Sequence, residues 1–426
     1  MLKAAPVSRL SSAFSAAVLS WCVVTGPVWA ESPPPAQPAQ PAQPFYATRF
    51  ERQPNPAELT ELGRRLFNEP ALSASGRMSC ASCHSPQHAY GPANALSVQL
   101  GGPDGHLQGL RSVPSLRYRQ ATPHFSEHFS DNDGNDSIDQ GPTGGRTWDG
   151  RANSAHEQAE MPLLSPLEMA NRSPADVIAR LTASPSAGAF RTTFGPQTLS
   201  QPDQAWKGLL WALEVFQQSP ADFYPYNSRY DAFLRGQAQL NAAERRGMAV
   251  FNDPNKGNCL QCHPGAVKRG AFPEFTDHGL IALGVPRNKA ISANADPAWF
   301  DLGLCGPMRT DLKDHPEYYG LFKTPSLRNV AVRQAFFHNG VYHRLEDAVR
   351  FYAERDTRPE RVFPRGRDGR VKKYDDLPAK YHSNVNTEAP FGTDPGGRAR
   401  LSEADVRDLV AFLRTLTDSD LPAARH

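Results

Sequence analysis

Two copies of the pattern Cys-x-x-Cys-His constrain this chain more than any other feature. Two thiols at this spacing match the two vinyl groups of a haem, and the adjacent histidine shares one side of a helical turn, where it reaches the iron. A zinc site would need four clustered ligands and a thioredoxin-type dithiol a βαβ setting, and neither pattern is visible. The sequence therefore predicts two covalently bound haem c groups, held by Cys80, Cys83, His84, Cys259, Cys262 and His263.

The surroundings of the two patterns are similar, which indicates an internal duplication. The segments 55–70 and 241–254 each begin with Asn followed three residues later by Glu, a capping-box start, and each ends in Phe-Asn-acid-Pro. Pro-Ser-Leu-Arg then occurs at 114–117 and again at 325–328. Each half closes on an amphipathic helical pattern. A repeat of this kind predicts one haem in each half.

The composition favours helices joined by irregular connections. Strand-like alternation is scarce, and 39 prolines and 32 glycines punctuate the chain. We expect a mainly α fold with two cytochrome c-like haem domains in tandem and long irregular loops, an N-terminal one at 51–225 and a C-terminal one at 226–426. The DNDGND stretch at 131–136 is expected to be a solvated loop, because Pro142 stands where a calcium-binding EF-hand needs its last glutamate.

The first fifty residues predict export. Basic residues precede an apolar stretch at 16–24 that is too short to span a bilayer, and a small residue, Ala30, follows at a suitable distance for cleavage. We expect a cleaved signal peptide at 1–30, a Pro/Ala/Gln-rich linker at 31–50 and a periplasmic mature protein without stable membrane insertion. The net charge of +2 gives no support to nucleic-acid binding.

Together these motifs resemble the bacterial di-haem cytochrome c peroxidases and their relative MauG. The resemblance extends over about 55–417 and rests on LFNEP…SCASCH, on WDGRA at 148–152 with the Gln and Glu that follow it, and on FKTPSLRNVAVRQAFFHNG at 322–340. It implies a peroxidase-type oxidoreductase in which the N-terminal haem reacts with hydrogen peroxide and the C-terminal haem transfers electrons.

The resemblance also implies catalytic residues between and beside the haems. It places the family's inter-haem tryptophan on Trp148, its pocket glutamine on Gln158 and its acid–base glutamate on Glu168. A carboxylate beside the iron can take a proton from peroxide and return it to the departing oxygen. Gln158 can hold peroxide by hydrogen bonds, and Trp148 offers an oxidisable ring between two metals. The alternatives are a tryptophan that only packs the core and a glutamate that only caps a turn.

The distal residue of the second haem separates the branches of the family. A methionine shortly after an HDG-like motif ligates this iron in the peroxidases, and a tyrosine does so in MauG. The corresponding position here is Tyr352, so the resemblance implies a His263/Tyr352 haem of the MauG-like branch. A phenolate ligand favours high-valent iron and lowers its potential. Spacing alone leaves Met161, Met169 and Met308 open as distal ligands.

Three further positions follow from the resemblance. The family's inter-haem calcium is bound by an asparagine side chain and two backbone carbonyls, which correspond to Ser112, Arg333 and Ala335. The backbone carbonyls survive substitution, but serine is a weaker ligand than asparagine. The surface tryptophan through which MauG reaches its partner corresponds to Gly257, so a role in methylamine dehydrogenase maturation is not expected. His106 lies in the loop where some peroxidases carry a removable distal histidine, and we expect it at the surface.

The expected function is therefore a redox reaction between peroxide and a partner protein. Oxidising equivalents would pass from the N-terminal haem through Trp148 and the C-terminal haem to an electron donor, for example an aromatic residue of a partner protein. One alternative is a conventional cytochrome c peroxidase that takes electrons from a small cytochrome or cupredoxin. A second alternative, outside the enzymes, is a di-haem electron-transfer cytochrome with both irons six-coordinate.

Overall fold

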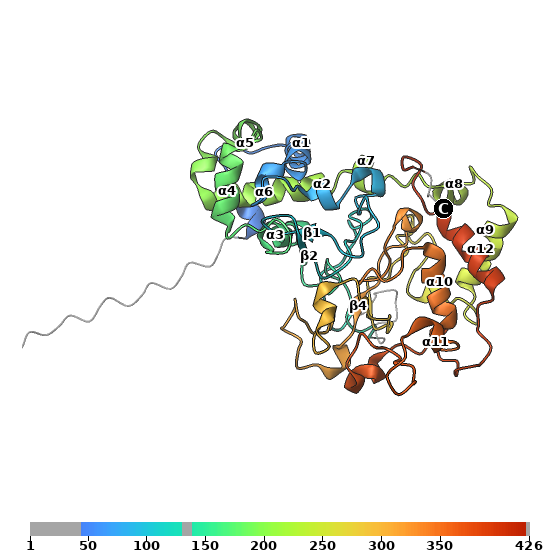
Figure 1. The fold of residues 1–426 in the computed structure, drawn as a ribbon. Coiled ribbons are helices and arrows are strands. Elements are labelled where there is room, and N and C mark those ends of the chain that lie inside the picture. Colours follow the sequence, from blue (N-terminus) through green and yellow to red (C-terminus); the bar gives the residue numbers. More distant parts are fainter. Residues whose placement is uncertain (1–43, 130–138, 423–426) are drawn as a thin grey trace, which may run out of the picture. The chain divides into compact units, whose positions relative to one another are not determined.

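Helices dominate the part of the chain that the computed structural model describes, residues 44–129 and 139–422 (Figure 1). The expected mainly α fold is confirmed, since strands in these ranges form only two short antiparallel ladders, β1 with β2 and β3 with β4. The elements are α1 (Pro56–Phe67), α2 (Cys80–Cys83), β1 (Leu100–Gly101), β2 (Leu107–Gln108), α3 (Ala155–Leu164), α4 (Pro174–Ala183), α5 (Ala187–Phe194), α6 (Pro202–Phe216), α7 (Pro220–Phe223), α8 (Arg229–Leu234), α9 (Ala242–Asn252), β3 (Leu280–Ile281), β4 (Phe322–Lys323), α10 (Leu345–Glu354), α11 (Pro359–Val362) and α12 (Glu403–Arg414).

Phe45–His426 form one structural unit, distinct from Met1–Pro44. The expected signal peptide at 1–30, most of the expected linker at 31–50 and the DNDGND stretch at 131–136 lie outside the described residues. Every helix within 44–129 and 139–422 is too short or too polar to cross a membrane.

The two helices that precede the haem-attachment patterns begin in the same way. Asn55 accepts a hydrogen bond from the Glu58 backbone at 3.0 Å, and the Glu58 side chain accepts one from the Asn55 backbone at 2.9 Å. Asn241 and Glu244 make the same reciprocal pair at 2.9 and 2.7 Å. Each pair satisfies two backbone groups that the first turn of a helix leaves free, and the predicted capping boxes of α1 and α9 are thus confirmed.

A glycine allows close helix crossing in each half. Helix α1 packs on α6, and α9 packs on α12. A Cβ atom at Gly63 would lie 2.0 Å from the Ala212 carbonyl oxygen, and one at Gly247 would lie 1.9 Å from the Asp408 carbonyl oxygen. No larger side chain fits at either crossing without a shift of the backbone. The duplication therefore extends from the sequence to the way the helices pack.

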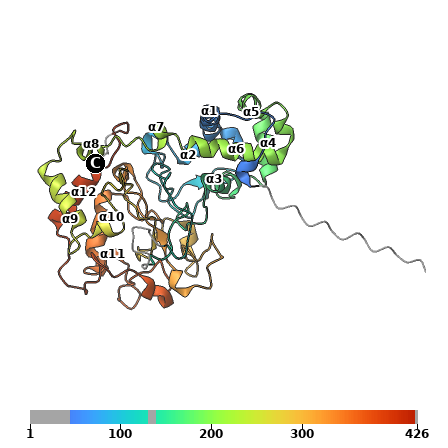
Figure 2. The same ribbon diagram turned by 180° about the vertical axis from the view of Figure 1, so that it is seen from behind.

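Two main hydrophobic cores follow from these helix pairs. The first gathers buried side chains from α1 and α3 to α7, and the second gathers those from α8 to α10 and α12. Figure 2 shows the same two groups of helices from behind. The largest members include Phe67, Phe190, Phe194, Phe216 and Phe223 in the first core and Tyr230, Phe251, Phe275 and Phe412 in the second.

One buried carboxylate joins the two halves near the end of the chain. Asp418 accepts hydrogen bonds from Arg117 at 2.7 Å and from the Tyr118 hydroxyl at 2.6 Å. It also accepts one from the Asn329 side chain at 2.7 Å. Arg117 and Tyr118 belong to the first Pro-Ser-Leu-Arg region and Asn329 to the second, so the repeated segments meet at Asp418.

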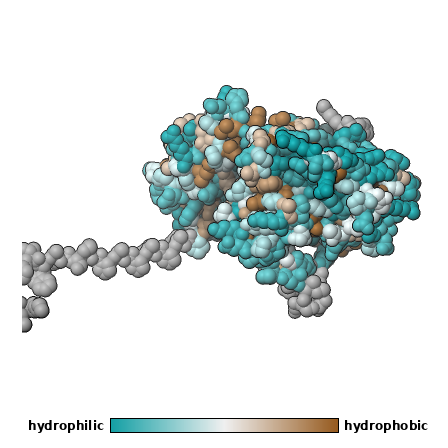
Figure 3. All heavy atoms as spheres, turned by 60° about the horizontal axis from the view of Figure 1, so that its bottom comes forward, coloured by the Kyte–Doolittle hydropathy of each residue, from teal (hydrophilic) through white to brown (hydrophobic). Residues whose placement is uncertain are grey.

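The surface is largely hydrophilic on the face that Figure 3 shows, with smaller hydrophobic patches between the polar side chains. Among the described residues, the large apolar side chains that are exposed are Tyr46, Leu96, Leu100, Leu107, Leu260 and Val267. Leu100 and Leu107 lie on the β1–β2 hairpin, and Leu260 and Val267 lie on either side of His263 in the sequence. Single exposed apolar residues are common in proteins, whereas groups of them indicate a surface that binds a partner.

Candidate active site

The two histidines of the haem-attachment patterns are held by the same contact. His84 follows α2, and His263 follows a 3-10 turn at Cys259–Gln261. Nδ1 of His84 lies 2.8 Å from the Tyr90 carbonyl oxygen, and Nδ1 of His263 lies 2.8 Å from the Phe275 carbonyl oxygen. Because a carbonyl can only accept, Nδ1 carries the hydrogen and Nε2 is left free to bind a metal.

Burial keeps both imidazoles in the form that a metal needs. Desolvation lowers the pKa of His84 and of His263 to about 4, so both rings are neutral at neutral pH. Protonation of Nε2 would compete with an iron for the same lone pair. The protein therefore presents two neutral, oriented imidazoles.

The Pro-Ser-Leu-Arg segments hold these histidine anchors in place. The Ser115 hydroxyl donates to the Ala89 carbonyl oxygen at 2.5 Å, and the Ser326 hydroxyl donates to the Glu274 carbonyl oxygen at 2.6 Å. Each acceptor lies one residue before the carbonyl that anchors a histidine. The serine of each Pro-Ser-Leu-Arg repeat thus fixes the backbone segment whose carbonyl orients a histidine ring.

The four thiols fit covalent attachment better than the two alternatives considered from the sequence. Each is free, and burial raises the pKa of Cys83 to about 11 and the pKa of Cys80, Cys259 and Cys262 to about 12. Reactive dithiols and zinc ligands are thiolates, which these surroundings disfavour. In the ranges that the structure describes, no three His, Cys, Asp or Glu side chains gather as a metal cluster.

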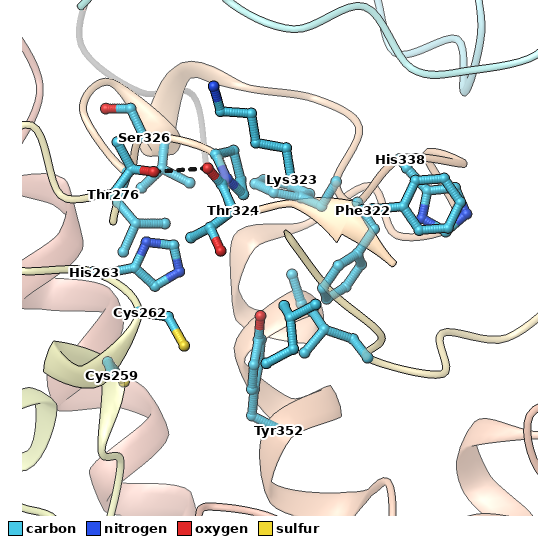
Figure 4. Close-up of a pocket in the computed structure, with 18 of the residues that line it drawn as sticks. Cys259, Cys262, His263, Thr276, Phe322, Lys323, Thr324, Ser326, His338 and Tyr352 are labelled. Atoms are coloured by element: carbon cyan, nitrogen blue, oxygen red, sulfur yellow. Dashed lines mark hydrogen bonds between the residues drawn. The ribbon is translucent and has the colours of Figure 1, made fainter. Parts of the chain in front are cut away.

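A cavity of about 250 Å³ opens beside the second pattern. Its wall includes Cys259, Cys262 and His263, together with apolar side chains from both sides. Figure 4 shows His263 and Tyr352 pointing into the space between them, Tyr352 from α10. This site can hold a covalently attached haem. It offers two free thiols, a histidine Nε2 without a hydrogen-bond partner among the described residues, and an apolar wall.

Methionine does not take the distal place in this cavity. The described residues that line it include no methionine. Met169 is buried in the first hydrophobic core, and Met308 is half-buried away from the cavity wall. Tyr352 lines this cavity and carries the phenol oxygen that the resemblance implies as a ligand.

The Tyr352 phenol is surrounded by the cavity wall and by an aromatic neighbour. Its ring stacks on Phe391 with 5.3 Å between ring centroids. Burial, with a smaller contribution from the charges of Cys259 and Cys262, raises the pKa of Tyr352. A phenolate at this place thus depends on a cation bound next to it.

Trp148 belongs to the first half of the chain but lines the cavity of the second. Its indole Nε1–H donates to the Ser112 carbonyl oxygen at 2.7 Å, and its own carbonyl oxygen accepts from the Lys323 backbone at 2.8 Å. Trp148 is 9% exposed. The ring is therefore held by contacts with residues that are remote from it in the sequence.

A buried ionic network that we did not predict fixes the loop after Trp148. Asp149 accepts from Arg111 at 2.7 Å and from Arg151 at 2.6 Å, and Arg111 also bonds Asp301 of the second half. Although burial raises it, the pKa of Asp149 is brought down to about 2 by Arg111 and Arg151. The sequence showed Asp149 as part of the Trp-Asp-Gly motif. It could not show the network, because Arg111 and Asp301 are remote from Asp149 in the sequence.

Glu168 lies beside the first haem-attachment pattern. Its carboxylate is near enough to Cys80 and Cys83 for its charge to raise the pKa of both thiols. Burial raises the pKa of Glu168 itself, against a hydrogen bond from Ser165 and the charge of Arg151. The backbone carbonyl of Glu168 accepts from Gly102 of the hairpin segment at 2.7 Å, which ties the residue to β1 and β2.

The other residues predicted near the first site are placed as follows. Gln158 lies on α3 and is half-buried. His106 is exposed in the segment between β1 and β2, as expected. His338, in the second copy of the Trp-Asp-Gly region, was missed: its ring stacks on Phe322 at 3.5 Å between centroids and lines the second cavity (Figure 4).

The three residues implied as a calcium site come together, but they do not fit calcium. The Arg333 guanidinium lies among the oxygens, with Nη2 3.2 Å from Ser112 Oγ and Nε 3.2 Å from the Ala335 carbonyl oxygen. A calcium ion needs six to eight oxygen ligands at about 2.3–2.6 Å. Here a cationic side chain already uses the Ser112 hydroxyl and the Ala335 carbonyl, so the side chains at this place do not fit calcium.

Comparison with known proteins supports the same chemistry. Residues 57–239 match the family described as "Di-haem cytochrome c peroxidase". The methylamine utilization protein MauG of Paracoccus denitrificans (strain Pd 1222) is 35% identical over 393 residues, covering 86% of this chain and 90% of that protein. The cytochrome c551 peroxidase of Pseudomonas aeruginosa is 28% identical over 304 residues, covering 71% of this chain and 73% of that protein.

A solved structure agrees over nearly the same length. The diheme peroxidase BthA from Burkholderia thailandensis E264 superposes with a TM-score of 0.77 at 37% identity, covering 89% of this chain and 91% of that one. The repeated histidine anchors, the free thiol pairs and these matches lead to one conclusion. The chain belongs to the di-haem cytochrome c peroxidase and MauG family, oxidoreductases with two haem c groups that act on peroxide.

Proposed function

We propose that this protein is a periplasmic, MauG-like di-haem enzyme in which peroxide reacts at the His84 site and Trp148 carries oxidising equivalents toward the His263/Tyr352 site. The observation that carries the proposal is that His263 and Tyr352 face the same cavity, whose wall also includes Trp148. The two haems supply the peroxide and redox chemistry, and the chain orients the reactants, moves protons and directs the equivalents.

The internal repeat supports an open distal side at the first site. Helices α3 and α10 start equally far after Gly150 and Gly340, the glycines of the two equivalent motifs. In this register Pro162 of α3 corresponds to Tyr352 of α10. Proline carries no atom that can bind a metal, so the first site lacks the counterpart of the tyrosine. That difference favours peroxide access at the first site.

Glu168 is proposed as the proton carrier of the peroxide reaction. Its carboxylate lies near both thiols of the first pattern, and burial raises its pKa toward the range in which a group both accepts and returns a proton. It takes the proton from the attacking oxygen and gives it to the departing one. Gln158, half-buried on α3, holds the peroxide by hydrogen bonds.

Trp148 is proposed as the relay between the two sites. The hydrogen bond from its Nε1–H to the Ser112 carbonyl and the bond from Lys323 to its own carbonyl hold the ring in one orientation. A fixed ring between two redox centres shortens each electron-transfer step. The arginine–aspartate network around Asp149 stiffens the same loop.

The redox partner is proposed to bind away from the MauG exit position. A Cβ atom at Gly257 would lie 2.6 Å from the Val250 carbonyl oxygen, so no tryptophan side chain fits here. Leu260 and Val267 are exposed on either side of His263 in the sequence and offer an apolar contact close to the second site. A partner protein with an oxidisable aromatic residue, or a small cytochrome or cupredoxin, would dock there.

We further propose that the chain consists of two haem domains, 51–225 and 226–426, exported after removal of 1–30. Support for the domain boundary comes from the two main hydrophobic cores, whose residues fall on either side of it. Support for export comes from the basic, apolar and small residues in sequence at the start of the chain.

The proposal is tested by adding stoichiometric peroxide to the fully ferric protein with no electron donor present. Optical and electron paramagnetic resonance spectra of both haems are followed. The MauG-like function predicts that both ferric signals disappear together and that a long-lived oxidised state remains. A protein that reacts only after one haem has been reduced is a conventional cytochrome c peroxidase, and one that does not react in either state is an electron carrier.

A further inference from the structure

A half-buried guanidinium lies where the family places an ion. Arg333 Nη2 is 3.2 Å from Ser112 Oγ and 3.2 Å from the Val113 carbonyl oxygen, and its Nε is 3.2 Å from the Ala335 carbonyl oxygen. All three partners are neutral oxygens. Neutral oxygens of this kind are ligands that a hard cation such as calcium prefers. Here the positive charge comes from the Arg333 side chain.

Arg333 has no carboxylate partner in the described part of the chain. The ion pairs there do not include it. Burial alone lowers its pKa, to about 10, so the group remains cationic at neutral pH. Within the described ranges, its charge is met only by neutral oxygens.

Arg333 lines both the large cavity of the second site and a much smaller one. The smaller cavity is about 10 Å³, with a wall that includes His88, Gly91 and Asn94. That volume holds at most a single water molecule. Calcium would also meet the guanidinium charge at close range. A calcium ion bound here would therefore compete with Arg333 for the same oxygen lone pairs.

The position of Arg333 connects the second cavity with Trp148. Ser112 accepts from Arg333 through its hydroxyl and from the Trp148 indole through its carbonyl. Arg333 also lines the second cavity. The guanidinium thus lies at this cavity and holds the residue that orients the tryptophan.

We propose that the Arg333 guanidinium replaces the inter-haem calcium of the family, so that the protein carries its bridging cation covalently and works without calcium. Arg333 is a positioning residue: it holds Ser112, and through Ser112 it holds the Trp148 ring. Calcium content and thermal stability do not depend on the proposed peroxide chemistry, so failure of this inference is distinguishable from failure of the proposed function.

The first test uses the wild-type holoprotein. It is treated with the chelator EGTA, its calcium content is measured, and its thermal midpoint is recorded with and without added calcium. We expect no stoichiometric calcium and no change of the midpoint, since a ligand raises stability only if the folded state binds it. One retained calcium per chain, or a midpoint that rises with calcium, would overturn the proposal.

The second test compares Arg333→Thr with Arg333→Lys, with the exposed Arg398→Thr as the matched control. Arg333→Thr removes the cation and opens space for an ion, so its thermal midpoint is expected to become calcium-dependent. Arg333→Lys keeps a cation and is expected to stay insensitive to calcium, as is the control. Equal insensitivity of both Arg333 variants would contradict the exchange of one cation for the other. Should Arg333→Thr fail to fold, the calcium content of the wild type decides alone.

Discussion

His84 and His263 have nearly identical surroundings, whereas the segments that face them differ. Each histidine donates from Nδ1 to a backbone carbonyl at 2.8 Å, and each anchor is steadied by the serine of a Pro-Ser-Leu-Arg segment. Opposite them, α10 presents Tyr352 to the second site, and α3 has Pro162 at the equivalent position of the first.

This comparison shows which parts of a duplicated haem domain are constrained by attachment and which are free to specialise. Covalent attachment and proximal ligation make the same demands on both halves, so the same short-range contacts occur twice. The distal residue decides whether an iron has an open position. In the proposed function, the difference between Pro162 and Tyr352 on equivalent helices gives the two sites different tasks.

The largest expected effect comes from Glu168→Gln at the first site. Loss of the proton carrier is expected to slow the peroxide reaction by about 10²–10⁴-fold, the usual contribution of general acid–base catalysis. Haem content and the spectrum of the second haem should be unchanged. Glu160→Gln, on the neighbouring helix α3, is the matched control. An unaltered rate in Glu168→Gln would exclude the acid–base role.

The pH dependence of the same step sharpens this prediction. Burial raises the pKa of Glu168 above 4.5, and the group must be ionised to accept a proton. The wild-type rate is therefore expected to fall as the pH decreases through the raised pKa of Glu168, and to be full above it. Stopped-flow rates across this range should show that acidic limb in the wild type and lack it in Glu168→Gln.

Tyr352→Phe tests the other half of the comparison. Removal of the hydroxyl is expected to change the optical and paramagnetic spectra of the second haem and to abolish the long-lived oxidised state, while the first haem keeps its spectrum. Tyr342→Phe is the control, because Tyr342 packs against the same aromatic cluster without lining the cavity. Unchanged spectra in Tyr352→Phe would show that the tyrosine is not a ligand.

Trp148→Phe is expected to separate the two sites functionally. The first haem should still react with peroxide, whereas the response of the second should be slowed, because the oxidisable indole is gone. The lost hydrogen bond to Ser112 is expected to cost about 1 kcal/mol of stability. Trp211→Phe, in the first core, is the control. Responses of both haems at wild-type rates would rule out a relay through Trp148.

The smallest effects concern the shared scaffold rather than the chemistry. Gly63→Ala and Gly247→Ala each place a methyl group against a backbone carbonyl, and each is expected to lower the free energy of unfolding by about 1–3 kcal/mol. Gly188→Ala has open space and should be neutral or slightly stabilising. Denaturation midpoints check this, and a much smaller effect at one crossing would mean that the halves are packed differently there.

The sequence by itself determined the features that depend on short spacings. The two attachment patterns, the capping boxes at Asn55 and Asn241, and the amphipathic helices could be predicted because their signals lie within one or two helical turns. The mainly α class followed from the same signals. The position of Tyr352 was available only through the resemblance, since nothing local distinguishes a ligand from a core tyrosine.

The tertiary structure decided what depends on contacts between remote residues. Arg333 and Ser112 are 221 positions apart, and Arg111 and Asp301 are 190 apart, so no local pattern announces either pair. Alignment compares positions and not side-chain directions, so it could not show the Arg333 guanidinium among those oxygens. The resemblance implied that Trp148 lies between the haems. Its contacts with Ser112 and Lys323 appear only in the folded chain, because they join residues that are far apart in the sequence.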